Sequence, residues 1–522
     1  MSTRSLVWGL SIFFLAFTSC GEKTSTVDTL IPLPVTIEKK AGAFAVNAET
    51  TIYADTSIAD VLRLAGELAA KVQQATGWQW KVNGTNSEGM AKASAEKNAI
   101  LLMINPADAG SSHEGYSLNI SETNVVLSAS HSAGIFYGLQ TMRQLFPHEI
   151  EKAGSGQKDW SLPAVAIKDY PEYAYRGSML DVSRHFFGVE EIKHFIDLLS
   201  FYKMNILHLH LSDDQGWRIE IKSWPNLTAH GGSSQVGGAK GGFYTQEEYK
   251  DIVKYAAEHY VTVIPEIDMP GHTNAALASY AELNCNDTAT QLYIGTEVGF
   301  STLCTRKEVT YRFLDSVIRE LAAITPGQYL HIGGDESHST PIEDYIPFME
   351  RVQQIVKKYG KTAIGWDEIA NCQLEPGTLA QYWAEEKNAQ MAVSKGAQLI
   401  MSPAHKIYMD MQYDSTTKLG LHWAGFIEVD SAYIWNPTTV QEGVERKNIM
   451  GVEAPLWSET LVTRQDIEYM MFPRFPGYAE IAWSPKPGNW DDYKKRLAHH
   501  SARMDALGIT YYRSPKVPWP AK

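Results

Sequence analysis

Two adjacent carboxylates, Asp335 and Glu336, stand where an apolar segment meets a Gly-Gly turn. Residues 328–332 are typical of a buried strand, and Gly333 and Gly334 have no Cβ, which lets the backbone pass close to a bound ligand. Neighbouring acids repel each other and burial raises that cost, so this pair indicates chemistry or cation binding. Taken alone, an Asp-Glu pair is more often a solvated loop start. The rest of the chain decides between the two interpretations.

Apolar segments followed by polar turns recur along the second part of the chain. Between them lie segments with a helical spacing of apolar residues, for example 189–204 and 245–259. Such strand–helix units favour a (β/α)8 barrel over a doubly wound sheet, although the sixth and seventh strands are weakly marked. The predicted fold class is therefore α/β, with a TIM barrel over residues 168–512. The predicted strands are 177–182, 205–211, 261–267, 329–333, 363–366, 379–383, 398–401 and 452–457.

The carboxyl ends of these strands carry the side chains that could act on a substrate, because that face of a barrel holds the active site. Acids, an arginine, a histidine and several aromatic rings gather there, without thiolates or a glycine-rich phosphate loop. Each residue alone could have a purely structural role, since most tryptophans belong to the core and most surface charges are solvated. Their joint placement indicates a carbohydrate site formed by Arg184, Asp213, His272, Asp335, Glu336, Trp366, Trp383, Tyr408, Asp410, Trp457 and Glu459.

Metal and nucleic-acid functions have little support in the sequence. His208 and His210 alternate on the second strand and could hold a metal, but alternate residues facing a barrel interior are more often packing. Neither CxxC nor HExxH spacing occurs, so we expect no metal site and no cofactor. The net charge of -14 argues against nucleic acid or an anionic membrane as partner.

The first part of the chain has a different pattern. Residues 31–167 mix short alternating strands, such as 116–120 and 125–127, with helical periods at 58–75 and 133–145. This mixture predicts a small α+β domain that precedes the barrel. We find no catalytic constellation in it. Residues 513–522 are expected to form a C-terminal tail.

The N-terminus indicates export. An apolar run from Leu6 to Phe17 is shorter than the roughly 20 residues that span a bilayer. Residues 1–19 resemble the signal peptide of a bacterial lipoprotein, in which Cys20 becomes the lipidated first residue, although Phe17 stands where such signals usually have leucine. Residues 20–30 would form a tether. The expected location is the periplasm or the cell surface, with membrane contact only through a lipid at Cys20.

Three further cysteines lie in the mature chain. Cys285 and Cys304 flank a polar loop, and an exported chain can oxidise them to a disulfide. Loop-closure entropy for such a crosslink is worth roughly 3 kcal/mol. Cys372 has no obvious partner and is expected to be a small buried apolar residue.

Six ordered motifs make the chain recognisable. LDVSRHFF, HLHLSDDQGWR, PEIDMPGH, HIGGDE, WDE and APLWSE resemble the family 20 glycoside hydrolases, which are exo-acting β-N-acetylhexosaminidases. The resemblance covers essentially the whole mature chain. It implies a retaining mechanism in which the substrate's 2-acetamido oxygen, rather than an enzyme carboxylate, attacks the anomeric carbon to form an oxazolinium ion.

The resemblance also implies roles for individual residues. Glu336 matches the general acid and base, Asp335 the residue that holds the acetamido N–H, and Tyr408 the donor to the acetamido oxygen. Asp213 and His272 match a pair that sets the protonation of the acid. Sugar hydroxyls would be bound by Arg184, Asp410 and Glu459, and the walls would be Trp366, Trp383 and Trp457, with Trp423 further out. The implied substrate is a glycan with a terminal β-linked N-acetylhexosamine.

Three alternatives stay open at this point. A family member could remove a sulfated hexosamine or a disaccharide unit, but Asp410 and Glu459 would repel a sulfate. A glycan-binding surface lipoprotein that kept only the fold would be expected to lose Asp335 or Glu336, and both are present. A metal-dependent barrel hydrolase would lose activity in EDTA.

Overall fold

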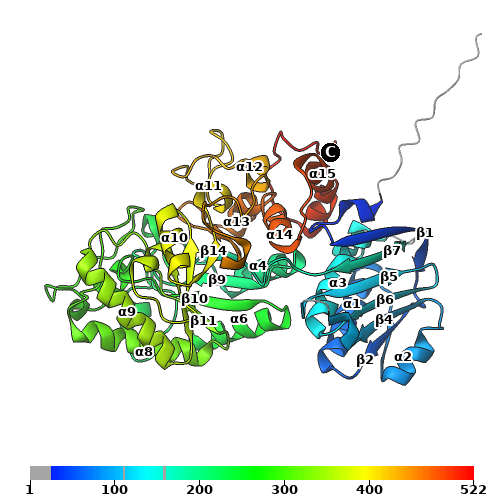
Figure 1. The fold of residues 1–522 in the computed structure, drawn as a ribbon, viewed down its shortest axis with the longest axis horizontal. Coiled ribbons are helices and arrows are strands. Elements are labelled where there is room, and N and C mark those ends of the chain that lie inside the picture. The colour runs from blue at the N-terminus through cyan, green and yellow to red at the C-terminus, as the bar shows by residue number, and fades with distance from the viewer. Residues whose placement is uncertain (1–24, 110–111, 157–159, 522) are drawn as a thin grey trace, which may run out of the picture.

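A computed structural model describes residues 25–109, 112–156 and 160–521, and within them a closed barrel of eight parallel strands forms the larger part (Figure 1). The pairing of the last strand with the first closes the barrel. The predicted fold class is confirmed, including the weakly marked sixth and seventh strands. The barrel strands are β8 (Tyr175–Asp181), β9 (Ile206–His210), β10 (Thr262–Glu266), β11 (Tyr329–His331), β12 (Thr362–Trp366), β13 (Leu379–Tyr382), β14 (Gln398–Met401) and β15 (Ile449–Leu456).

Helices surround the barrel and connect its strands. Between β12 and β13, a fully described stretch, the connection is only a short 3-10 segment, Asp367–Asn371, instead of an α-helix. The helices are α4 (Val189–Phe201), α5 (Asn226–Ala229), α6 (Gln246–Glu258), α7 (Asn274–Ser279), α8 (Glu308–Ile324), α9 (Ile342–Lys358), α10 (Glu386–Ser394), α11 (Ala404–Ile407), α12 (Val429–Tyr433), α13 (Arg464–Met471), α14 (Phe475–Trp483) and α15 (Trp490–Leu507).

Local sequence signals explain where these helices begin and end. Thr245 and Glu248 form a reciprocal capping box that satisfies backbone donors at the start of α6. Apolar residues of α6 recur on one face, and Ile252 and Ala256 are buried there against the barrel. The two predicted barrel helices, 189–204 and 245–259, are therefore present with ends that differ by a few residues.

The smaller domain is built on a mixed sheet. Its strand order is β1-β7-β5-β6-β4-β2-β3. Helices α1 (Ala59–Thr76) and α3 (Ser132–Leu145) pack in its main apolar core, and α2 (Ser87–Ala93) packs in a separate cluster. The strands are β1 (Thr36–Val46), β2 (Thr51–Asp55), β3 (Lys81–Thr85), β4 (Ala99–Ile104), β5 (Tyr116–Ile120), β6 (Asn124–Ala129) and β7 (Trp160–Asp169).

Buried polar contacts join the two domains. Asp169, at the end of β7, accepts hydrogen bonds from Lys203 (2.8 Å) and from the indole of Trp483 (3.0 Å), both in the barrel domain. The guanidinium of Arg176 on β8 is held by both carboxylate oxygens of Glu114 at 2.8 Å. Charged pairs with this geometry are directional, so they fix the orientation of one domain against the other.

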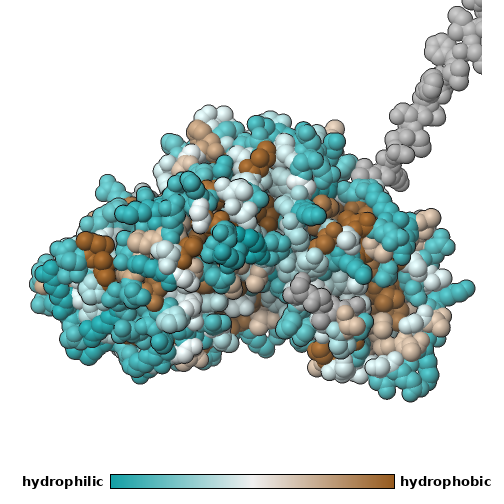
Figure 2. Space-filling model, viewed as in Figure 1, coloured by the Kyte–Doolittle hydropathy of each residue, from teal (hydrophilic) through white to brown (hydrophobic). Residues whose placement is uncertain are grey.

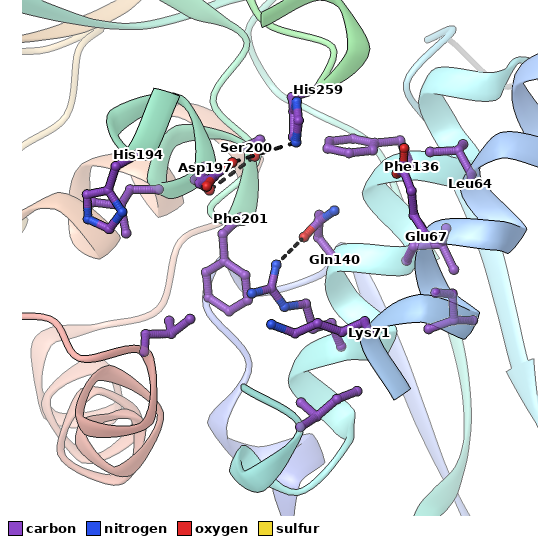
Figure 3. Close-up of a pocket in the computed structure, with 16 residues that line it drawn as sticks. Leu64, Glu67, Lys71, Phe136, Gln140, His194, Asp197, Ser200, Phe201 and His259 are labelled. Atoms are coloured by element: carbon purple, nitrogen blue, oxygen red, sulfur yellow. Dashed lines mark hydrogen bonds and ion pairs between the residues drawn. The ribbon is translucent and has the colours of Figure 1, made fainter. Parts of the chain in front are cut away.

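A cavity of about 410 Å³ lies at this domain junction, between α1 and α3 of the small domain and α4 of the barrel (Figure 3). Arg143 lines it and donates hydrogen bonds to Gln140 and, twice from its Nε, to Glu151. Lys71 also pairs with Glu151, at 3.0 Å. Lys71 and Arg143 therefore both have a partner within the protein. No residue of the predicted carbohydrate site lines it.

The surface is largely hydrophilic. On the face in Figure 2, apolar residues form small separate patches among hydrophilic side chains. Among the helices that the structure describes, none combines the length and the apolarity needed to cross a membrane. The predicted signal peptide (1–19), Cys20 and the first part of the predicted tether lie outside the described residues.

Candidate active site

The carboxyl ends of the barrel strands surround a pocket of about 190 Å³. Most of the predicted site residues line it, and three of them, Asp213, His272 and Trp366, lie behind its walls. Thr296, Val298 and Leu421 also contribute and were missed from the sequence, because no strand precedes them. The full lining is Arg184, Thr296, Val298, Asp335, Glu336, Trp383, Tyr408, Asp410, Leu421, Trp423, Trp457 and Glu459.

The Gly-Gly turn after β11 serves a different purpose from the one expected. Gly333 and Gly334 have φ angles of 61° and 104°, which favour glycine. A Cβ on Gly333 would lie 1.7 Å from the Asp268 carboxylate, and one on Gly334 would lie 2.8 Å from the Tyr345 hydroxyl. The glycines thus make room for protein side chains rather than for a ligand. Asp268 in turn accepts the N–H of Gly334 at 3.1 Å.

The two adjacent acids occupy different environments. Asp335 is buried, and burial together with the charge of Asp268 raises the pKa of its carboxyl well above the usual range. Glu336 is only partly buried. Burial by itself would raise the pKa of Glu336, but a hydrogen bond with His272 and the charge of that ring lower it. The backbone of Glu336 has a φ of 44°, a region that is costly for a residue with a Cβ and is often found at functional sites.

His272 connects these acids to Asp213. Its Nε2 lies 3.5 Å from Glu336 and 3.7 Å from Asp335, while its Nδ1 lies 3.2 Å from Oδ1 of Asp213. Burial opposes the charged form, but the acids around His272 raise its pKa well above the usual range. Arg184 pairs with the other oxygen of Asp213 at 3.0 Å. The predicted pair of Asp213 and His272 is therefore formed, and its His272 lies beside both acids.

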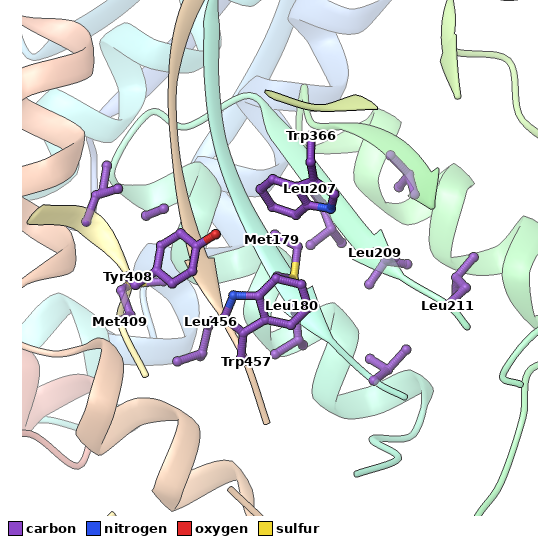
Figure 4. Packing of buried hydrophobic residues seen from close by; sticks show 14 of the residues in the cluster. Met179, Leu180, Leu207, Leu209, Leu211, Trp366, Tyr408, Met409, Leu456 and Trp457 are labelled. Carbon is purple, nitrogen blue, oxygen red and sulfur yellow. The ribbon is translucent and has the colours of Figure 1, made fainter. Parts of the chain in front are cut away.

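Aromatic rings enclose the pocket. Trp457 lies 6.3 Å from Tyr408 and 5.8 Å from Trp366 between ring centroids, and the three rings lie close together in Figure 4. Trp423, which is 56% exposed, lies 5.9 Å from both Trp383 and Tyr408. Trp366 is fully buried, packs against Trp457 and is not among the residues that line the pocket.

Several polar atoms at this pocket have no partner among the described residues. They are Oδ1 of Asp335, both carboxylate oxygens of Asp410 and Nε of Arg184. Burial and the nearby charge of Glu459 raise the pKa of Asp410 well above its usual range. Buried polar groups are nearly always hydrogen-bonded, so these atoms mark places where a bound ligand would supply the partner.

The WDE motif holds one of the walls. Asp367 accepts the backbone N–H of Trp383 at 3.0 Å and also the N–H groups of the next two residues. Glu368 accepts the indole N–H of Trp383 at 3.2 Å. Both acids belong to the motif seen in the sequence, but only the fold shows that both bind Trp383.

The disulfide expected from the sequence is present, between Cys285 and Cys304 with a Cα–Cα distance of 4.9 Å. It closes the base of the loop that carries Thr296 and Val298 to the pocket. Cys372 is free and buried, as predicted.

Comparison with known proteins agrees with this geometry. The chain matches "Glycosyl hydrolase family 20, catalytic domain" over residues 173–345 and 338–486, and "Glycosyl hydrolase family 20, domain 2" over residues 28–170. The chain therefore belongs to glycosyl hydrolase family 20, and it is a glycoside hydrolase.

Individual relatives cover nearly the whole chain. It is 39% identical to a β-N-acetylhexosaminidase of Cellulomonas fimi, over 94% of this chain and 97% of that protein. A solved structure of the GH20 β-N-acetylhexosaminidase from Streptomyces coelicolor A3(2) superimposes with a TM-score of 0.90, at 47% identity over 95% and 99% of the two chains. A mutant β-hexosaminidase of Streptomyces plicatus, in complex with the product GlcNAc, matches with a TM-score of 0.90, at 48% identity over 95% and 98%.

Proposed function

We propose that this protein is an exo-acting, retaining β-N-acetylhexosaminidase that removes terminal β-linked N-acetylhexosamine residues from glycans. The observation that carries the proposal is the set of unpartnered polar atoms on Asp335, Asp410 and Arg184 inside an aromatic pocket. At about 190 Å³ the pocket is smaller than the typical site for a drug-sized ligand, and it suits a single sugar residue.

In the first step, the oxygen of the substrate's own acetamido group attacks the anomeric carbon. The bond to the leaving oxygen breaks, and Glu336 supplies the proton that this oxygen needs. Asp335, through its free Oδ1, accepts the acetamido N–H. The positive charge that develops on the oxazolinium ring opposes the effects that raise the pKa of Asp335, favours its ionised form and is balanced by it. Tyr408 donates to the acetamido oxygen and orients it.

The proton supply follows from the free enzyme's charges. The pKa of Glu336 is lowered and that of His272 is raised, so before substrate binds the proton is on His272, 3.5 Å from Glu336. A bound neutral sugar excludes water from Glu336 and favours its protonated form. In the second step Glu336 takes a proton from water while the water oxygen bonds to the anomeric carbon. The bond from that carbon to the acetamido oxygen breaks, so the acetamido group is restored and the anomeric configuration is retained.

Side-by-side hydrolysis of 4-nitrophenyl β-GlcNAc, β-GalNAc and 6-sulfated β-GlcNAc tests the substrate class. We expect the unsulfated hexosaminides to be cleaved and the sulfated one to be a poor substrate, because Asp410 and Glu459 line the pocket. Preferred cleavage of the sulfated sugar would favour the alternative substrate. Activity that disappears in EDTA would favour a metal-dependent hydrolase.

We also propose that the chain is exported and anchored through a lipid on Cys20. The signal-like N-terminus supports this, and so does the Cys285–Cys304 disulfide, because disulfides persist mainly in oxidising compartments. Detergent phase partitioning of the natural protein and of Cys20→Ser tests the anchor. Wild type in the aqueous phase would contradict it.

A further inference from the structure

A second set of ionisable side chains fills the barrel interior below the pocket. Glu266, at the end of β10, is fully buried and is the centre of this set. Its Oε2 lies 2.5 Å from Nδ1 of His210 and 3.0 Å from Nε2 of His208. Its Oε1 accepts the indole N–H of Trp366 at 2.9 Å and lies 2.9 Å from His331. Burial would raise the pKa of Glu266, but the three histidines lower it well below its usual range.

His210 connects this centre to the predicted site. Its Nδ1 faces Glu266, and its Nε2 lies 2.8 Å from Oδ2 of Asp213. Because both neighbours are acids, both ring nitrogens must carry a proton to donate, and the ring is then positively charged. Burial opposes this charge, but the charge of Glu266 and the hydrogen bonds to both acids raise the pKa of His210 well above its usual range.

The network also extends away from the site. His208 lies between Glu266 and Glu453, with its Nδ1 2.8 Å from Glu453. Glu453 further contacts Gln381 and Tyr175, and neither of these residues lines the pocket. Acids and charged histidines therefore alternate along the interior, from Glu453 at one end to the pair of His272 and Glu336 at the other.

We propose that Glu266 is a positioning residue for catalysis, which acts through His210 on the Asp213–His272 pair and through Trp366 on the Trp457 wall. The inference rests on the proposed function, because it concerns the proton held between His272 and Glu336. Glu266 does not line the pocket and does not touch the substrate. Its charge keeps His210 charged, and His210 in turn neutralises part of the charge of Asp213.

The direction of the effect on the pKa of His272 follows from the charges that contact the Asp213–His272 pair. The acids that act on His272 are Asp213, Asp214, Asp268, Asp335 and Glu336. A glutamine at position 266 can still accept from Trp366, but its amide donates to Nδ1 of His210, which then becomes neutral. The charges of Glu266 and His210 are then lost, and the lost positive charge is the one that contacts Asp213, the partner of His272. His272 therefore holds its proton more tightly, and Glu336 delivers it less readily.

The test compares Glu266→Gln with Glu453→Gln, which removes the other buried acid beside His208 but touches no site residue. With 4-nitrophenyl β-GlcNAc, Glu266→Gln should lower kcat about tenfold, the lower end of what one lost hydrogen bond to a charged group costs. In its pH profile, the alkaline fall of kcat/KM should shift to higher pH by roughly 0.5 to 1 pH unit. Glu453→Gln should keep kcat within about twofold and leave the alkaline fall in place.

The outcomes separate this inference from the proposed function. A wild type that does not cleave the hexosaminide would reject the function itself. An active wild type with equal losses in both variants and an unshifted alkaline fall would show that Glu266 is only structural. If Glu266→Gln does not fold, nitrogen-15 NMR of histidine-labelled wild type decides, with the His210→Gln variant used for assignment. A charged His210 at pH 8 supports the inference, and a neutral ring overturns it.

Discussion

Two cavities of this molecule show opposite arrangements of charge. The domain-junction cavity is the larger, at about 410 Å³, and its Lys71 and Arg143 both form ion pairs with Glu151. The pocket at the barrel strand ends is about 190 Å³, and Asp335 and Asp410 there have carboxylate oxygens without a partner. Volume therefore does not identify the site. The pocket is identified by its lining, where aromatic rings surround buried carboxylate oxygens that have no partner in the described part of the protein and that a ligand can complete.

The sharpest test of this comparison is how strongly the enzyme prefers substrates that carry the 2-acetamido group over substrates that lack it. If Asp335 binds the acetamido N–H, a sugar without an acetamido group leaves the Asp335 carboxylate unpaired. For such a sugar kcat/KM should be lower by roughly 10⁴-fold or more. Aryl β-glucoside and β-N-acetylglucosaminide hydrolysis are measured side by side. A thiazoline analogue should inhibit the wild type tightly and Asp335→Asn poorly. Efficient glucoside cleavage, with a 2-fluoro sugar trapped on Asp335 or Glu336, would show that the enzyme supplies its own nucleophile.

Replacing the general acid should have the next largest effect. Glu336→Gln keeps the shape of the side chain but cannot donate the carboxylic proton, and general acid catalysis is typically worth ~10²–10⁴-fold. The kcat for natural oligosaccharides, whose sugar alcohols are poor leaving groups, should fall far more than the kcat for 4-nitrophenyl glycosides. Equal losses for both substrate types would contradict the role of Glu336.

Removing the charge of Glu151 at the domain-junction cavity should change the stability of the protein and not its activity. Burial would raise the pKa of Glu151, but the charges of Arg143 and Arg503 lower it to about 2. A lowered pKa in the folded state stabilises the protein above pH 4.5, and this contribution, on the order of 3 kcal/mol, disappears as the pH falls towards 2.

Urea unfolding of wild type and Glu151→Gln measures this contribution. At pH 7 the variant should be less stable, towards low pH the difference should shrink, and kcat at pH 7 should stay within about twofold. A large loss of kcat without a loss of stability would mean that the junction cavity is itself a functional site.

The smallest effect concerns the loop that carries Thr296 and Val298 to the pocket. Reducing the Cys285–Cys304 disulfide should lower stability by at most roughly 3 kcal/mol, because it releases only a short loop. Intact mass with and without reduction before alkylation should show one bridge and one free thiol, at Cys372. Three free thiols in protein produced in the periplasm would contradict the pairing.

Sequence patterns were sufficient for the barrel and for most of the site. All eight barrel strands lie where apolar segments predicted them, with ends that differ by a few residues. Parallel strands bring their carboxyl ends to one face, so side chains far apart in the chain, such as Arg184 and Glu459, were expected together before any coordinates. Thr296 and Val298 could not be found, since loops carry no periodic signal.

The sequence by itself determined which residues gather at the barrel end, because parallel strands bring their carboxyl ends to one face. Only the tertiary structure decided what surrounds them. It showed that Gly333 makes room for Asp268, that Trp366 packs against another tryptophan, and that Glu266 is shared by three histidines. The physical reason is that hydrogen bonds and charges act over a few ångströms, and those distances exist only after strands distant in sequence pack together.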